Sequence, residues 1–160
     1  MKFKSTLLIP VFSAIALSGC GDDSQKAPFT INSTAASDFA YALANQPAVD
    51  ITLQQDENNF CNVTFLRSNV KQGYKASVEQ KNSGELSASC YWNKAQYIQS
   101  SKHPTLASLS IVELDPELQS ATLAVSLKLV DSKSLSDYFE VKETIFTLSG
   151  DQFTNLVTMP

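Results

Sequence analysis

The sequence predicts a mainly β protein: an antiparallel β-sandwich or half-barrel that carries one short N-terminal helix. Several runs alternate apolar and polar side chains, turn-forming residues separate these runs, and helical spacing is confined to one early stretch. The alternative is an α+β fold in which the helix packs across an antiparallel sheet, because periodicity alone does not separate the two. At 160 residues the chain has the length of one domain.

The helix is expected in the stretch AASDFAYALAN, which starts after Ser33 or Thr34. A hydroxyl residue stands in front of the stretch as a cap, and Pro47 follows it. The apolar residues at helical spacing are Ala35, Ala36, Phe39, Ala40 and Leu43.

From Val49 the period changes to two, which indicates strands. A first strand is expected over 49–53 and a second over 61–65, with a turn at Asp56-Glu57-Asn58-Asn59 between them. Residues 70–78 and 85–92 continue the alternation around Lys81-Asn82-Ser83-Gly84. Because Asn and Gly tolerate positive φ, this pair of runs predicts a β-hairpin.

The last part of the chain predicts a three-stranded meander. After a break at His103-Pro104 and a run over 106–114, the clearest strand covers 121–129, where leucines and valines alternate with small or polar residues. A loop from Asp131 leads to a partner strand over 138–148. The turn Ser149-Gly150-Asp151 then leads into a final strand over 153–157.

The N-terminus has the form of an export signal. Lys2 and Lys4 precede an apolar stretch over 6–17, too short for a permanent membrane helix, and Leu17-Ser18-Gly19-Cys20 follows at once. This tetrad resembles the lipobox of bacterial lipoproteins. The resemblance covers residues 1–20 and implies that the signal 1–19 is removed and that Cys20 is acylated and anchored in a membrane.

The polar stretch after Cys20 is interpreted as a tether, so that 20–32 comprise the lipidated cysteine and the tether, and 33–160 the single globular domain. The resemblance to the lipobox implies that this domain faces the periplasm. In this class the residue after the lipidated cysteine influences sorting. Gly21 stands there instead of Asp, which favours the outer membrane over the inner one, although Asp22 is one position away.

With Cys20 lipidated, Cys61 and Cys90 remain as an even pair in an oxidising compartment, which predicts a disulfide. Each cysteine is in phase with the apolar residues of its expected strand. A zinc site is the weaker alternative because His103 is the only histidine, and a redox dithiol more often has Cys-x-x-Cys spacing.

The net charge of the mature chain limits which binding partners are expected. Of 12 basic residues, Lys2 and Lys4 leave with the signal, so that ten oppose 16 acidic ones and the net charge of the mature chain is −6. The basic residues are scattered and include one arginine, Arg67, so nucleic acid is not expected as a ligand. The expected partners are the membrane, through the lipid on Cys20, and an envelope protein.

No catalytic residues, metal site or cofactor are expected. The sequence has no Gly-x-Ser-x-Gly elbow, His103 falls in an expected loop, and the turn 56–59 lacks the glycine and closing glutamate of a calcium loop. Carboxylates at strand positions are interpreted as surface charges, with a two-carboxylate hydrolase as the minor alternative. They are Glu113, Asp115, Glu117, Glu140 and Glu143.

Aromatic residues offer one candidate interaction surface. Trp92 shares the phase of Cys90, whereas Tyr91 points to the other face, with Tyr97 close along the chain. Because tyrosine is favoured at interfaces, Tyr91 and Tyr97 are candidate partner contacts; a second sheet packed over them is the alternative.

The function expected from these features is a lipid-anchored, periplasm-facing accessory protein that binds another envelope protein, as an assembly subunit, an inhibitor or an immunity-type protector. The alternatives are a lipoprotein that binds a small molecule, lipid or glycan, and the carboxylate hydrolase. A deep apolar pocket would favour the first alternative, and two close acids with shifted pKa values would favour the second.

Overall fold

The computed structural model describes residues 28–80 and 84–158. The signal, the lipobox and Cys20 lie outside these residues, so the expectations about them keep the status of predictions. Nine strands and one α-helix follow one another along the described chain. The strands are β1 (Ser33–Leu43), β2 (Gln46–Asp56), β3 (Asn59–Leu66), β4 (Lys75–Glu79), β5 (Leu86–Trp92), β6 (Ala95–Ile98), β7 (Leu106–Asp115), β8 (Ser120–Asp131) and β9 (Tyr138–Ser149); a 3-10 turn covers Arg67–Asn69, and α1 covers Asp151–Val157.

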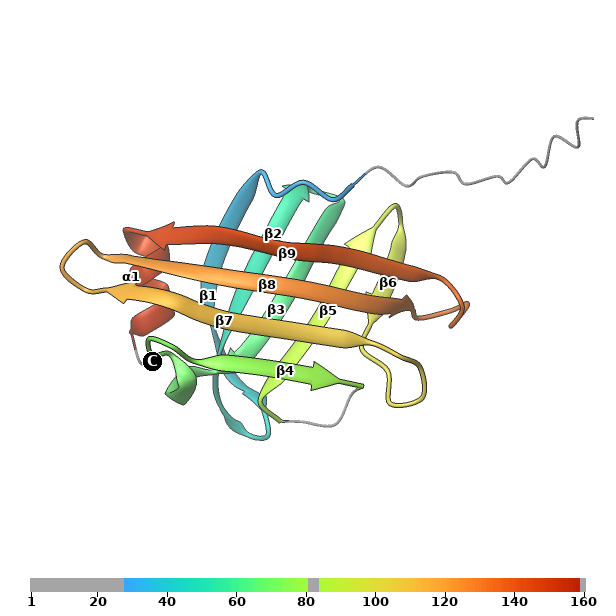
Figure 1. Ribbon diagram of the computed structural model, residues 1–160, viewed down its shortest axis with the longest axis horizontal. Helices are drawn as coiled ribbons and strands as arrows, with labels where there is room; N and C mark the ends of the chain where they lie inside the picture. The colour runs from blue at the N-terminus through green and yellow to red at the C-terminus, as the bar shows by residue number, and fades with distance from the viewer. Residues whose placement is uncertain (1–27, 81–83, 159–160) are drawn as a thin grey trace, which may run out of the picture.

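The described ladders are antiparallel, and the sheet folds over into two layers (Figure 1). The front layer has the order β9-β8-β7-β4, and the back layer has the order β1-β2-β3-β5-β6. Strand β6 joins the layers because it pairs with β5 and also with the end of β8. The described residues form no ladder between β1 and β4 or β9, so the sheet is not closed. The predicted class of mainly antiparallel β structure is confirmed.

The core lies between the layers and is made by the alternation that the sequence predicts. On β3 the side chains of Cys61, Val63 and Phe65 are fully buried, and on β8 those of Leu123 and Leu129 are. One face of each strand points inward because successive side chains alternate across a strand. The inward side chains of β3 and β8 come from opposite layers and belong to one hydrophobic cluster.

The disulfide is confirmed: Cys61 and Cys90 are bonded across β3 and β5, where they stand directly opposite each other in the ladder. Their Cα atoms lie 4.0 Å apart. Because both cysteines are buried, the bond links two adjacent strands of the back layer from the core side.

The position of the helix was predicted wrongly. Residues 33–43 form β1, which pairs with β2 through a two-residue turn in which Ala44 and Asn45 both have positive φ. Two positive φ angles define the turn that matches the twist of a β-hairpin, and this turn outweighs the weak helical spacing of an alanine-rich run. The predicted final strand over 153–157 is instead α1, in which Phe153 and Leu156 are buried one helical turn apart.

The predicted hairpin of residues 70–92 is also wrong. Strand β4 pairs with β7 of the front layer, whereas β5 pairs with β3 and β6 of the back layer. Residues 81–83 of the predicted turn lie outside the described residues. The alternating pattern fixes which face of a strand is buried but not which strand lies beside it.

The N-terminal end of the described chain belongs to the domain. Phe29 and Ile31 pack against the core, and the ring of Phe29 meets those of Trp92 and Phe139 at centroid distances of 5.5 and 5.8 Å. The backbone N–H of Asn32 donates to the carbonyl of Gln54 at 2.9 Å. The folded part therefore includes residues 29–32, which the sequence pattern assigned to the tether.

Candidate functional site

The outer face of the front layer is hollowed between its strands. Register across the four strands places Lys75, Ser110, Ala124 and Ile145 in one row. The next row holds Ser77, Ser108 and Ser126, and the row after it holds Glu79, Leu106, Lys128 and Glu140. The serine row forms the lowest part of this face because serine side chains are short, and Ser110 and Ala124 of the neighbouring row are small as well.

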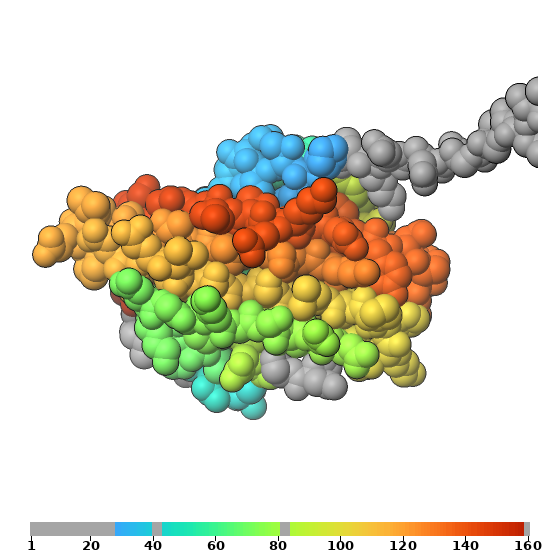
Figure 2. Space-filling view, viewed as in Figure 1, coloured from blue at the N-terminus to red at the C-terminus, as the bar shows by residue number. Residues whose placement is uncertain are grey.

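A cavity of about 360 Å³ lies over these small side chains. Its lining includes Ser77, Ser108, Ser110 and Ala124, with Lys75 on β4 at one side and Glu143 on β9 at the other. A second hollow of about 230 Å³ adjoins Leu106 and is bordered by Glu79, Pro104 and Lys128. We call the two hollows together the front groove; Figure 2 looks onto this face, with β9 at the top and β4 at the bottom.

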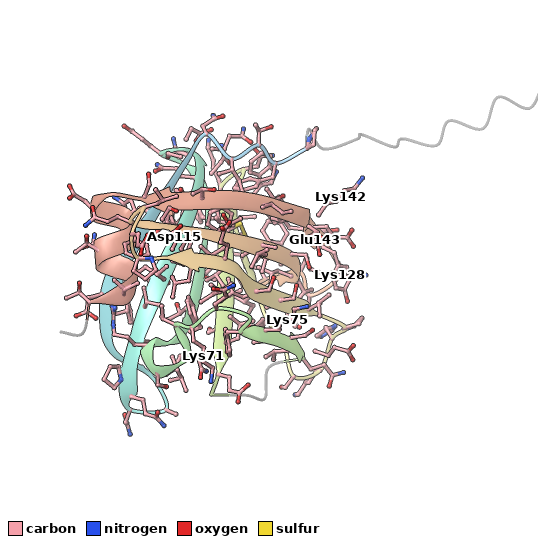
Figure 3. All side chains as sticks on the ribbon, turned by 60° about the vertical axis from the view of Figure 1, so that its left-hand side comes forward. Lys71, Lys75, Asp115, Lys128, Lys142 and Glu143 are labelled. Atoms are coloured by element: carbon pink, nitrogen blue, oxygen red, sulfur yellow. A yellow bond between two sulfur atoms is a disulfide. The ribbon has the colours of Figure 1, made fainter. Side chains whose placement is uncertain are left out.

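A β-bulge in β9 places the glutamate beside the groove. Between the pairs Val125–Thr144 and Leu127–Val141, the single residue Ser126 stands opposite two β9 residues, Lys142 and Glu143. Such a bulge redirects side chains and bends the strand. Figure 3 shows Lys75, Lys128 and Glu143 projecting from this layer around the groove.

Hydroxyl groups of Ser77, Ser108 and Ser110 lie among apolar side chains in the larger hollow. The Oγ atoms of Ser108 and Ser126 lie 2.6 Å apart and share a hydrogen bond. Lys128 is already engaged, since its Nζ lies 3.5 Å from Oε1 of Glu140 and 5.2 Å from the ring centroid of Tyr138. By contrast, neither the Nζ of Lys75 nor the carboxylate of Glu143 has an ion-pair partner among the described residues.

Apolar side chains flank the front groove as well. Ile145 is 63% exposed in the same row as Ala124, and Val112 at the register shift of β7 is 53% exposed. Exposed apolar side chains beside a groove that carries hydroxyl groups and two unpaired charges form a surface suited to contact with another molecule.

The predicted tyrosine pair does not form one surface. Tyr91 is on the outer face of the back layer and stacks on Phe60 at a centroid distance of 6.1 Å. Tyr97 is 3% exposed, and its ring centroid lies 5.3 Å from that of Phe139 in the core. The prediction that Tyr97 is a surface contact is therefore wrong, because the β5–β6 register pairs this residue with Cys90 on the inward face.

The carboxylates named from the sequence differ in role and position. Glu140 is held by Lys128, Glu143 borders the groove, and Oδ1 of Asp115 accepts from the backbone N–H groups of Glu117 and Leu118 in the β7–β8 turn. His103 is half-buried in the loop after β6. No group of three or more metal-ligating side chains occurs in residues 28–80 and 84–158.

Three aspartates have shifted pKa values. Burial raises the pKa of Asp50, while a hydrogen bond from the Thr64 hydroxyl at 2.6 Å works in the other direction. Side-chain and backbone N–H donors of Asn59 and Asn58 lower the pKa of Asp56, and the backbone N–H groups of Ser134 and Lys133 lower the pKa of Asp131. Asp56 and Asp131 are the last residues of β2 and β8, and their carboxylates accept from the turns that follow, so their shifts reflect turn geometry.

Sequence reasoning missed the front groove. Alternation along 121–129 does place Ala124, Ser126 and Lys128 opposite the buried leucines. Alternation does not show that the serines of β4 and β7 stand beside them, because that depends on the order of strands in the layer.

Comparison with known proteins found no similar protein. No family model, no curated protein and no solved structure matches this chain. No helix in the described parts of the chain is long and apolar enough to cross a membrane.

Proposed function

We propose that this protein is a lipid-anchored accessory protein of the bacterial envelope, facing the periplasm, that binds another envelope protein through the front groove and performs no catalysis. The observation that carries the proposal is the groove itself: an open, small-residue surface across four strands, with a free lysine and a free glutamate on opposite sides. The resemblance to the lipobox supplies the address, with the outer membrane favoured.

A protein fits this surface better than a small ligand does. The groove consists of two hollows on one face, bordered by β4 along their length, and exposed apolar side chains continue beside it. Protein interfaces combine a contact area of this kind with a polar rim. Oppositely charged groups on the two sides would orient a partner and disfavour wrong ones.

The second candidate is a small-molecule, lipid or glycan ligand in the same groove. A volume of about 360 Å³ falls at the lower end of the range found for ligand sites, roughly 300–1,000 Å³. The same experiment separates the two candidates.

The test is cross-linked capture of the tagged, lipidated protein from native membranes, with captured proteins identified by mass spectrometry. We expect one stoichiometric envelope partner, lost when Ser108→Trp fills the groove and kept in Ser89→Trp, which places the same ring on the outer face of the back layer. Cys20→Ala controls for anchoring. Capture of no protein, together with thermal stabilisation by a lipid or glycan, would favour the second candidate.

A further inference from the structure

Three of the described strands pair on one side only: β1, β9 and β4. An unpaired strand edge presents a row of backbone N–H and C=O groups that can pair with another chain, so folded proteins usually cover or distort their edges. The three edges of this sheet differ in this respect.

Helix α1 covers the edge of β1 at Ala36. The backbone N–H of Ala36 donates to Oε1 of Gln152 at 2.6 Å, and Nδ2 of Asn155 donates to the carbonyl of Ala36 at 3.0 Å. At this residue two side-chain amides thus make the bonds that a neighbouring strand would make. Arg67 holds the helix in position by donating to the carbonyls of Asn155 and Leu156.

The edge of β9 is distorted. The bulge at Lys142 and Glu143 interrupts its regular spacing, and β1 and α1 pack against the strand. The start of the described chain passes along β9 as well, where Phe29 meets Phe139 (Figure 1). A further regular strand could therefore not pair along the whole length of β9.

Among the described residues, the edge of β4 is neither covered by side-chain hydrogen bonds, as β1 is at Ala36, nor interrupted by a bulge, although β5 of the back layer lies close to this strand. The N–H of Gln80 donates to the carbonyl of Thr105, and the N–H of Ile111 donates to the carbonyl of Tyr74. Because hydrogen-bonded residues alternate along an antiparallel pair, Ala76 and Val78 turn their backbone groups towards β7. Lys75, Ser77 and Glu79 therefore turn theirs outward, away from the sheet.

The outward residues of β4 are open to a second chain. The side chains of Lys75, Ser77 and Glu79 are exposed on the outer face, and no side-chain hydrogen bond or ion pair joins them to another described segment. Lys75 and Ser77 border the larger hollow of the front groove, and Glu79 borders the smaller one. A strand laid along β4 would thus lie at the rim of the groove.

We propose that an extended segment of the protein partner adds to the free edge of β4 as a further strand of the front layer. Its backbone pairs with the outward N–H and C=O groups of Lys75, Ser77 and Glu79. Charge selects its sequence: an acidic side chain stands beside Lys75 and a basic one beside Glu79, since facing side chains of adjacent strands interact directly. The inference rests on the proposed function, because it requires a protein partner.

The test uses full-length, lipidated protein in native membranes. A photo-cross-linking residue, p-benzoylphenylalanine, replaces Ser77 or Glu79 in separate variants and Thr147 on the far side of the same layer as a control. We expect cross-links from 77 and 79 to fall two residues apart on one partner segment, with none from 147, because side chains on one face of paired strands repeat every second residue.

A backbone variant tests the pairing itself. Ser77→Pro removes one outward N–H that β7 does not use, a change tolerated on edge strands, whereas Ser77→Ala removes the hydroxyl and keeps the N–H. Loss of a hydrogen bond predicts roughly tenfold weaker capture for Ser77→Pro than for Ser77→Ala. Thermal unfolding of both variants verifies that they fold.

Three other outcomes would overturn the inference, and they show whether the proposed function fails with it. A captured partner that cross-links elsewhere, and that Ser77→Pro and Ser77→Ala capture equally, leaves the proposed function standing without strand addition. Cross-links between two copies of this chain make the edge a self-association surface instead. Capture of no protein by the unmodified chain refutes the proposed function and the inference together.

Discussion

Arg67 joins three parts of the chain that lie far apart in sequence. Its side chain is 2% exposed, and one guanidinium nitrogen donates to the carbonyls of Asn155, Leu156 and Thr158 at the end of α1. The other terminal nitrogen lies 3.1 Å from Oδ1 of Asp38 on β1. A positive charge at a helix C-terminus is favourable, and here it also satisfies carbonyls that the helix leaves unpaired.

Replacing this arginine by Arg67→Met keeps much of its volume and removes every donor. Hydrogen bonds from a charged group contribute about 1.5–3 kcal/mol each, but bonds that share one donor group are not additive. The substitution leaves carbonyls at the end of α1 without a donor, and a buried acceptor left unsatisfied costs about 1–3 kcal/mol, so we expect the free energy of unfolding to fall by about 2–4 kcal/mol. For a domain of typical stability, about 5–15 kcal/mol, the loss is a large fraction of the total.

The assay is urea unfolding followed by tryptophan fluorescence, with amide hydrogen exchange of Ala36 as a local readout. Exchange at Ala36 should accelerate in Arg67→Met, because Gln152 protects that amide only while α1 is docked. The matched control is Asp38→Asn: its carboxylate is 45% exposed, so this variant should lose less than about 1 kcal/mol. Equal losses for the two variants, or a loss below about 1 kcal/mol for Arg67→Met, would refute the reasoning.

Three further changes have defined outcomes. Replacing Cys61 and Cys90 together by alanine should lower the free energy of unfolding by about 3–4 kcal/mol, from the entropy of a loop of roughly 30 residues, and a loss under about 1 kcal/mol in urea unfolding would contradict this. Gln152→Ala with Asn155→Ala should cost about 1 kcal/mol per hydrogen bond and cause self-association through the uncovered β1, measured by light scattering; an equally stable monomer would be inconsistent with the covering role. Burial raises the pKa of Asp50 above its ordinary 3.8, so the folded state binds this proton more tightly than the unfolded state does, and stability falls as the pH rises from the ordinary value through the raised one. Asp50→Asn should therefore be more stable than the unmodified protein at about pH 7 in urea unfolding, with a gain that disappears towards about pH 4; a constant gain would show that ionisation is not its source.

The sequence predicted the strands well where burial on one face was strong. The runs around Val63, Ala88 and Val125 alternate clearly, and each run lies in a strand with these side chains buried. On β8, Leu123 and Leu127 share the inner face with Val125. The disulfide was predicted from the even pair of cysteines in an oxidising compartment, and the alternation supported it because both cysteines were in phase with core residues.

The errors lie where local signals were weak or where strand order decided the outcome. Alanine-rich residues 33–43 have few large apolar side chains, so their spacing did not distinguish a helix from a strand, and the turn at Ala44 and Asn45 decided it. Tyr97 was wrongly assigned to the surface. The direction of its side chain depends on the pairing of β6 with β5, which places Tyr97 opposite Cys90 and which the local sequence does not show. Register and strand order are properties of the assembled sheet, so the front groove and the free edge of β4 had no local sequence signal.

The closure of β1 by α1 sets an order of events in time. The bonds between Ala36 and the amides of Gln152 and Asn155 join residues separated by 116 and 119 positions. Because a chain is made from its N-terminus, the first strand exists long before the helix that completes its edge, and contacts of such high sequence separation form slowly. Until the last residues arrive, the nascent domain has an open edge at β1 in addition to the one at β4, and a chain that ends early keeps both.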